Sequence, residues 1–271
     1  MLDSIIKNNR RLRIEHQTIL KECNNSDLDM FEILKNYLND YSAFYQLSPE
    51  AVEHKYIVFI DQYIKDFKVY LETDKYPYQV GTNVQFDRIT YDLALILSVF
   101  FTPVRFQIFK STLESIKVSD GKILIIGLGA AMELELIAKL FPHKQVDTYD
   151  ITISEFVKSR FSKSILHEKE FKFDENNKYD LLLIIELLEH LTQPYLFIKN
   201  CALSLNNLGT LVCTTASNMP QFDHLYNFHD DDFEIKIASL FSVQKQIELK
   251  HKLMNPNIHS YNTFYQLNKL G

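Results

Sequence analysis

A pair of glycines follows a short apolar run in the second half of the chain. Residues 122–126 lead into Gly127 and Gly129, and a helical pattern begins at Met132. Glycine has no Cβ, so it lets the backbone turn tightly and lets a ligand approach the main chain. The chain has only six glycines, which makes two of them in one turn unusual. The segment predicts a strand–turn–helix unit that either binds a nucleotide or forms a plain tight connection.

A carboxylate ends the next predicted strand. Asp150 lies 21 positions after Gly129, at the end of an apolar strand pattern over residues 145–149. At this place in a strand–helix–strand unit, an acidic side chain can accept hydrogen bonds from both ribose hydroxyls of an adenosine. Asp150 can also cap a helix that starts at Thr152. Together, the glycine turn and Asp150 predict an adenosine-type ligand and leave NAD and S-adenosylmethionine both open.

The third signal is a strand followed by an acidic segment. Residues 179–185 form an almost continuous apolar run, typical of a parallel strand covered on both faces. Residues 186–191 then read Glu-Leu-Leu-Glu-His-Leu. This stretch resembles the fourth-strand motif of class I S-adenosylmethionine-dependent methyltransferases, and most resembles the group that includes quinone-biosynthesis enzymes. Residues 209–215 are similar to that family's fifth strand, and residues 224–228 to the segment after it.

The resemblance covers about residues 120–268 and implies S-adenosylmethionine as co-substrate. The glycines would line the methionine end of the cofactor, Asp150 would hold the ribose, and Glu186 would lie beside the cofactor at the end of the fourth strand. The implied cofactor-binding residues are Gly127, Leu128, Gly129, Asp150, Ile151 and Glu186.

Two positions depart from the family pattern. Ile125 stands where the family has an acidic residue that binds the cofactor's ammonium group, and Ala131 replaces the third glycine. Losing a charge-assisted hydrogen bond costs about 1.5–3 kcal/mol unless another acid substitutes. Glu133 and Glu135 lie nearby on the following helix and are the acids closest in sequence.

Three histidines are the candidate catalytic residues. His224 and His229 belong to a segment expected over the carboxyl ends of the strands, where doubly wound sheets bind ligands. His190 falls where the family keeps a histidine, a position that suits packing as well as catalysis. The spacing of five between His224 and His229 fits no pair of metal ligands on a helix, so the sequence indicates no metal site.

The first 117 residues have helical spacing and resemble no methyltransferase core. Apolar residues recur every three or four positions over residues 31–45 and 52–70, and Ser48 with Pro49 is a helix-start signal. Two further helices are expected over residues 93–101 and 104–116. We therefore expect a helical region at 1–117, which acts as a lid over the acceptor or as a dimer interface, and a cofactor-binding domain at 118–271. Aromatic residues near the entry to that domain suit such a lid: Tyr76, Tyr78, Phe86, Tyr91, Phe100 and Phe101.

The second part of the chain alternates between strand and helix patterns. The fold class expected is α/β, a Rossmann-like, doubly wound and mostly parallel sheet that ends in an antiparallel hairpin. Helices are expected at 132–140, 152–161, 193–205 and 234–240. The hairpin strands are expected at 241–249 and 260–267, with a turn that contains Asn255, Pro256 and Asn257.

Composition limits the cellular compartment and the classes of partner that we expect. Twenty-nine basic and thirty-five acidic residues give a net charge of −6, which argues against non-specific nucleic-acid binding. The longest apolar stretch, residues 93–101, is too short to span a bilayer, and the N-terminus has no signal-peptide pattern. Three widely spaced cysteines form no disulfide framework or thiolate zinc motif. We expect a cytoplasmic protein with a small-molecule acceptor, with no nucleic-acid or membrane partner, and with a homodimer through the N-terminal helices as one use of their surface.

The leading interpretation is a methyltransferase that acts on nitrogen or oxygen of a small molecule. One alternative is transfer of the aminocarboxypropyl arm, as in nicotianamine synthase-like enzymes, which also pair N-terminal helices with this fold and have an apolar residue at the position of Ile125. A second, of another class, is a catalytically silent partner subunit that keeps the fold. The last is an NAD dehydrogenase, although that fingerprint favours Gly or Ala at the position of Met132.

Overall fold

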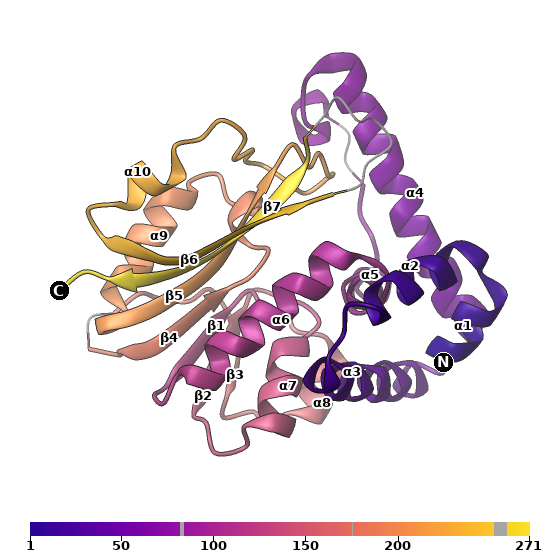
Figure 1. Cartoon of the computed structure of the whole chain (residues 1–271), viewed down its shortest axis with the longest axis horizontal. Helices are drawn as coiled ribbons and strands as arrows, with labels where there is room; N and C mark the ends of the chain where they lie inside the picture. The colour runs from indigo at the N-terminus through magenta and orange to yellow at the C-terminus, as the bar shows by residue number, and fades with distance from the viewer. Residues whose placement is uncertain (82–83, 175, 252–258) are drawn as a thin grey trace.

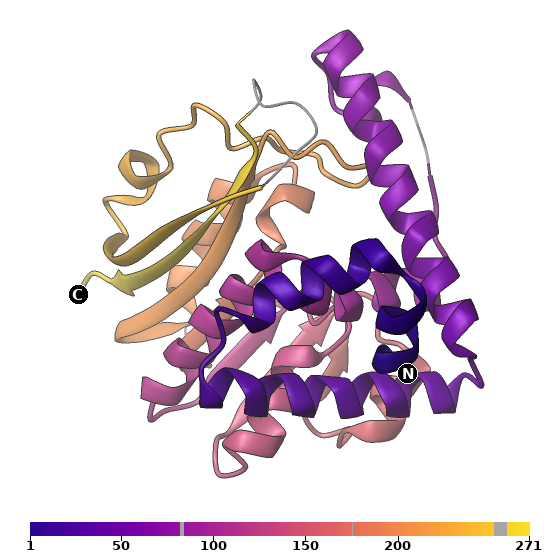
Figure 2. The same cartoon turned by 45° about the vertical axis from the view of Figure 1, so that its right-hand side comes forward.

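A computed structural model describes residues 1–81, 84–174, 176–251 and 259–271 (Figure 1). In these residues, six α-helices precede a mixed seven-stranded sheet, and Figure 2 shows the long helix α4 standing beside the sheet rather than in its layers. The N-terminal helices are α1 (Leu2–Asn8), α2 (Arg10–Leu20), α3 (Asn25–Phe44), α4 (Pro49–Thr73), α5 (Arg88–Phe101) and α6 (Pro103–Val118). The expected helical region over the first 117 residues is therefore present, with the short 3-10 helix η1 (Pro77–Val80) between α4 and α5.

The sheet has the strand order β3-β2-β1-β4-β5-β7-β6. Its first five strands are parallel, and β7 pairs antiparallel with both β5 and β6. The bounds are β1 (Ile123–Ile126), β2 (Val146–Asp150), β3 (Leu166–Glu168), β4 (Tyr179–Ile184), β5 (Leu205–Ser217), β6 (Phe241–Lys250) and β7 (Tyr261–Lys269). The expected fold class is confirmed, including the antiparallel hairpin. The turn predicted at 255–257 lies outside the described residues.

Helices cover both faces of the sheet. The crossover helices are α7 (Met132–Leu140), α8 (Glu155–Arg160) and α9 (Pro194–Leu203), and α10 (Phe233–Ile237) precedes the hairpin. Along β4, Leu181 and Leu183 pack with the N-terminal helices, α7 and α8, whereas Leu182 and Ile184 pack with α9 and α10. Side chains alternate between the faces of a strand, so an apolar run buried on both sides produces two cores.

Local signals explain where the N-terminal helices begin. The Ser48 hydroxyl accepts a hydrogen bond from the backbone N–H of Ala51 at 3.2 Å, and Pro49 occupies the first turn of α4. Asp87 caps α5 in the same way, through the N–H of Thr90 at 3.0 Å. Thr102 makes no such side-chain bond, so the start of α6 depends on Pro103 instead.

Within the described part of the chain, no helix alone has both the length and the apolar character needed to cross a membrane. The bent pair α5 and α6 meets that test only when the two helices are counted together.

A candidate cofactor and acceptor site

The larger candidate cavity lies at the carboxyl ends of β1, β2 and β4. Strand order reverses between β1 and β4, and ligands of open α/β sheets bind at such a switch point. The cavity volume is about 500 Å³. All six residues proposed from the sequence as cofactor-binding line this larger cavity: Gly127, Leu128, Gly129, Asp150, Ile151 and Glu186.

The turn after β1 needs both of its glycines. Gly127 has φ +78° and Gly129 has φ +52°, a left-handed backbone that residues with a Cβ rarely adopt. A Cβ on Gly129 would lie 3.0 Å from the Cδ1 atom of Leu95 in α5. Ala131 also has a left-handed backbone, with φ 59° and ψ 28°. A third glycine at this position would remove the backbone strain. The chain has alanine there and keeps the strain.

Asp150 joins the two turns that border the larger cavity. Its Oδ2 accepts a hydrogen bond from the N–H of Gly129 at 3.1 Å, and its Oδ1 accepts one from the N–H of Thr152 at 2.9 Å. The helix expected from Thr152 begins instead at Glu155 and is capped by Ser154. Asp150 therefore closes the turn after β2 and does not cap the helix. Each carboxylate oxygen has a second lone pair, so Asp150 can still accept two hydroxyl donors from a ligand.

The two acids of α7 have different surroundings. Glu135 is buried and forms a bidentate ion pair with Arg160, at 2.7 and 2.8 Å. Glu133 instead lines the larger cavity, and burial raises the pKa of its carboxyl above the usual value. Of these two acids, Glu133 alone faces the space beside the glycine turn.

A smaller cavity of about 150 Å³ adjoins the larger one beneath the N-terminal helices. Its aromatic wall comes from α4 and α5 and includes Tyr56, Phe59, Tyr63 and Tyr91, and we call it the aromatic cavity. Five residues line both cavities and so form their common wall: Tyr91, Leu95, Arg105, Glu186 and His190.

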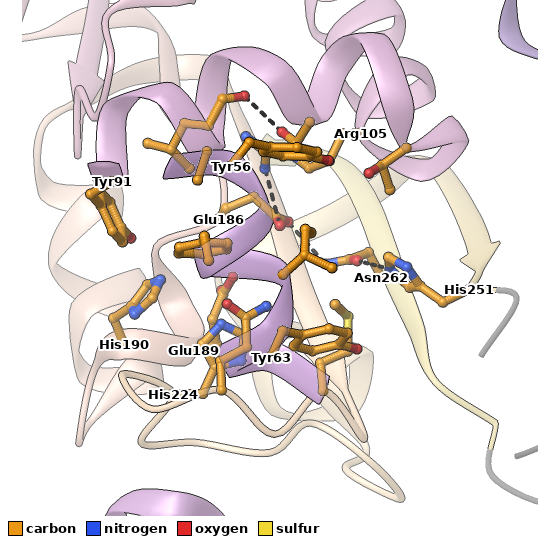
Figure 3. A pocket seen from close by; sticks show the side chains of 18 residues that line it. Tyr56, Tyr63, Tyr91, Arg105, Glu186, Glu189, His190, His224, His251 and Asn262 are labelled. Atoms are coloured by element: carbon orange, nitrogen blue, oxygen red, sulfur yellow. Dashed lines mark hydrogen bonds and ion pairs between the residues drawn. The ribbon is translucent and has the colours of Figure 1, made fainter. Parts of the chain in front are cut away.

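Glu186 is held between a helix and the hairpin at this common wall (Figure 3). Its carboxylate pairs with Arg105 Nη1 of α6 at 3.1 Å and accepts a hydrogen bond from Asn262 Nδ2 of β7 at 2.9 Å. His251 Nε2 lies 2.6 Å from the Oδ1 atom of Asn262 and extends this network. Glu186 itself has φ 50°, so the chain turns sharply just after β4. Arg105 and Asn262 are both distant from Glu186 in sequence, and no motif indicated Asn262.

Two of the three candidate histidines meet in the aromatic cavity. The rings of His190 and His224 are edge to face with centroids 4.9 Å apart, and both line this cavity with Glu189. His224 is buried, which lowers its pKa well below the usual value. His229 lies apart, with an exposed side chain 3.2 Å from the carboxylate of Asp230, and lines neither cavity.

Comparisons with known proteins address the fold. No protein-family model and no curated protein matches the chain. Among solved structures, the pyocyanin biosynthetic protein PhzM matches with a TM-score of 0.53 at 10% identity, covering 80% of this chain and 72% of that one. Human N-acetylserotonin methyltransferase, solved with S-adenosylmethionine, matches with a TM-score of 0.51 at 13% identity, covering 78% and 67%. The chain has the fold of class I S-adenosylmethionine-dependent methyltransferases.

A third match has a smaller TM-score. The N-methyltransferase NodS from Bradyrhizobium japonicum, solved with S-adenosylhomocysteine, has a TM-score of 0.47 at 15% identity, covering 77% of this chain and 98% of that one. The resemblance to the quinone-biosynthesis group stays a prediction from the sequence.

Proposed function

We propose that the chain is an S-adenosylmethionine-dependent methyltransferase that acts on nitrogen or oxygen of a small molecule. The observation that carries this proposal is the common wall of the two cavities. Group transfer between two molecules requires adjoining sites that bring the reacting atoms together. The larger cavity has the glycine turn and Asp150 on its border, and it meets the aromatic cavity at Glu186 and His190.

The residues of the larger cavity fit S-adenosylmethionine. The glycine turn leaves its main chain open to the methionine end, and Asp150 can accept the ribose hydroxyls. Ile151, Phe171 and Leu191 give this cavity apolar surface for a flat ring. The ammonium group needs an acid in place of Ile125, and we propose Glu133 for that role, since Glu135 is already paired with Arg160.

The aromatic cavity suggests the size of the acceptor. A cavity of about 150 Å³ is large enough to hold a benzene ring. We therefore propose a single-ring acceptor, or one that inserts a single ring under α4 and α5. These helices exclude water from the reacting atoms, which keeps the acceptor oriented.

When bound, S-adenosylmethionine supplies a methyl group already activated on a sulfonium. The protein's own residues then need to align the acceptor and promote loss of its proton. Arg105 and Asn262 hold Glu186 fixed at the common wall, where it orders the junction of the two cavities. Glu189, His190 and His224 line the aromatic cavity together, and we propose that this group of side chains promotes loss of the acceptor's proton.

Calorimetric titration with S-adenosylmethionine, S-adenosylhomocysteine and NAD tests the cofactor assignment. We expect micromolar binding of the first two ligands and none of NAD. Asp150→Ala should weaken both by at least tenfold, because it removes the acceptor of the ribose hydroxyls. Glu155→Ala, at an exposed position of α8, is the matched control and should bind like the parent. Absence of heat from folded, ligand-free protein would contradict the proposal.

Two other functions share this fold and give different results. Transfer of the aminocarboxypropyl arm is favoured by Ile125 and the helical lid, and its product gains an aminobutanoate unit while methylthioadenosine is released. Methyl transfer adds a single methyl group and releases S-adenosylhomocysteine, so product mass distinguishes the two reactions. A silent partner subunit would bind no cofactor in the calorimetric titration.

A further inference from the structure

Three ligand-type side chains meet at the aromatic cavity. Glu189 and His190 belong to the 3-10 helix η2 (Leu188–His190) after β4, and His224 belongs to the loop after β5. One donor atom from each of the three lies within 4.8 Å of the other two. Figure 3 shows the three side chains close together, apart from the network that holds Glu186. The two segments are distant in sequence, so spacing did not reveal the cluster.

The cluster contains buried polar atoms without partners. Glu189 is 1% exposed and His224 is 4% exposed. Neither carboxylate oxygen of Glu189 accepts a hydrogen bond, and Nδ1 of His224 has no partner among the described residues. A buried carboxylate without a partner costs several kcal/mol. The protein keeps this group in a cavity, where a bound species can compensate for it.

The cations nearby are already engaged. Arg105, the basic residue that lines the aromatic cavity, pairs with Glu186 at 3.1 Å. His190 is held by its Nδ1 atom, which lies 3.0 Å from the carbonyl oxygen of Asp223 and 3.6 Å from its carboxylate. This contact leaves Nε2 of His190 as the ring nitrogen available to a ligand. A carboxylate or carbonyl on the far nitrogen is the usual orienting partner of a metal-binding imidazole.

We propose that Glu189, His190 and His224 bind one divalent transition-metal ion, with open coordination positions that face the aromatic cavity. Two imidazoles and one carboxylate form the donor set of catalytic zinc sites and of mononuclear iron(II) sites. A calcium or magnesium ion would instead favour a set of oxygen ligands. The ion neutralises the buried carboxylate and is coordinated by atoms of the cluster that otherwise have no partner.

The site has a use in methyl transfer that rests on the proposed function. A divalent ion lowers the pKa of an oxygen ligand, as it does for bound water. An acceptor hydroxyl bound at an open position would release its proton to solvent and become an alkoxide or phenoxide. Its oxygen would then form the bond to the methyl carbon while the carbon–sulfur bond breaks, leaving a neutral thioether and the methyl ether.

Metal binding is measured without the cofactor. Untagged protein is treated with chelator and then titrated with Zn²⁺ and with Co²⁺, whose absorption spectrum reports the donor set. We expect one ion per chain with a micromolar or smaller Kd, and a cobalt spectrum without thiolate charge transfer. Glu189→Gln and His224→Ala should weaken binding by at least tenfold. His229→Ala, at the exposed histidine outside the cluster, is the matched control and should bind like the parent.

Thermal unfolding separates loss of the site from loss of the fold. Glu189→Gln replaces a buried carboxylate by a neutral group of the same shape, so its metal-free form should melt at or above the temperature of the parent. Failure of the folded parent to bind either ion, or binding that survives both cluster substitutions, would overturn the metal site. If metal binds but S-adenosylmethionine does not, the site stands and the proposed function fails.

Discussion

At the scale of single residues, the chain departs from its fold family around the glycine turn. Ile125 stands where the family pattern has an acid, and Glu133 lines the larger cavity from the first turn of α7. Ala131 keeps the left-handed backbone that a glycine would adopt without strain. Both departures lead to predictions that require only binding or unfolding measurements.

The first prediction concerns Glu133. Glu133→Gln should weaken the binding of S-adenosylhomocysteine by about 10- to 100-fold, because a charge-assisted hydrogen bond contributes about 1.5–3 kcal/mol. Binding of methylthioadenosine, which has no ammonium group, should be unchanged. Calorimetry with both ligands measures the difference. An equal loss for both would mean that the substitution disturbs the cavity, and no loss for either would leave the ammonium to another residue.

The second prediction concerns Ala131. A left-handed backbone costs a residue with a Cβ about 1–2 kcal/mol, whereas glycine loses about 0.5–1 kcal/mol of stability through chain entropy. Ala131→Gly should therefore raise the free energy of unfolding by up to about 1 kcal/mol in urea denaturation. Ala130→Gly is the matched control, since Ala130 is buried and has no left-handed backbone, and it should lower stability. A destabilised Ala131→Gly variant would contradict this account of the strain.

At the scale of elements, α5 positions two turns of the larger cavity. Arg88 donates through Nη2 to the carbonyl oxygen of Gly129 at 2.6 Å and through Nη1 to that of Thr152 at 3.0 Å. Its Nε atom lies 2.8 Å from the carboxylate of Asp92. One planar guanidinium thus connects α5 to the turns after β1 and β2.

Arg88→Lys tests this connection. A single ammonium cannot reproduce the forked geometry of three contacts, so at least one of these acceptors loses its donor, and the buried carboxylate of Asp92 is among them. We expect the free energy of unfolding to fall by about 1–3 kcal/mol and affinity for S-adenosylhomocysteine to fall by about tenfold. Arg13→Lys, at an exposed position of α2, should change neither quantity by a measurable amount. Unchanged affinity in the Arg88 variant would mean that α5 does not organise the cavity.

Long apolar patterns predicted most elements well. Residues 132–140 form α7 with the expected bounds. The glycine turn fixes where this helix begins, and its amphipathic pattern ends at Leu140. The strand β3 was missed, since Leu166–Glu168 is only three residues long and is at most half-buried. Within the site, the glycine turn and the Glu-x-x-Glu-His segment were visible locally. Asn262 was not, because only the fold brings β7 to the end of β4, and the pairing of Arg105 with Glu186 was hidden for the same reason.

At the scale of the whole molecule, one apolar core joins the N-terminal helices to the sheet. Phe100 and Phe106 of the helices belong to the same buried cluster as Ile125 of β1 and Phe264 of β7. The division into 1–117 and 118–271 stays a prediction. The shared core means that the N-terminal helices are packed onto the sheet, while the far end of α4 extends beyond it (Figure 2).

This core contains a carboxyl group whose titration should affect global stability. Asp92 is fully buried, and burial raises its pKa to about 6 even though Arg88 lies against it. Since the folded state binds the proton more tightly than the unfolded state, this stabilisation is present below about pH 4 and is lost as the pH rises through 6. Asp92→Asn does not titrate and provides the reference.

Urea denaturation of the parent and of Asp92→Asn, at pH 4.5 and at pH 7, measures the effect. The parent should lose about 1–3 kcal/mol of stability relative to the variant as the pH rises. If the parent instead becomes more stable relative to the variant as the pH rises to 7, the ion pair with Arg88 outweighs the cost of burying the charged carboxylate.

The most direct test of the whole account is a crystal structure of the protein with S-adenosylhomocysteine. We predict density in the larger cavity, with the ribose hydroxyls bonded to Asp150, the homocysteine end beside Gly127 and Glu133, and the sulfur directed at the wall shared with the aromatic cavity. Density in another place, a reversed ligand, or an empty cavity in crystals grown at saturating ligand would contradict the proposed function.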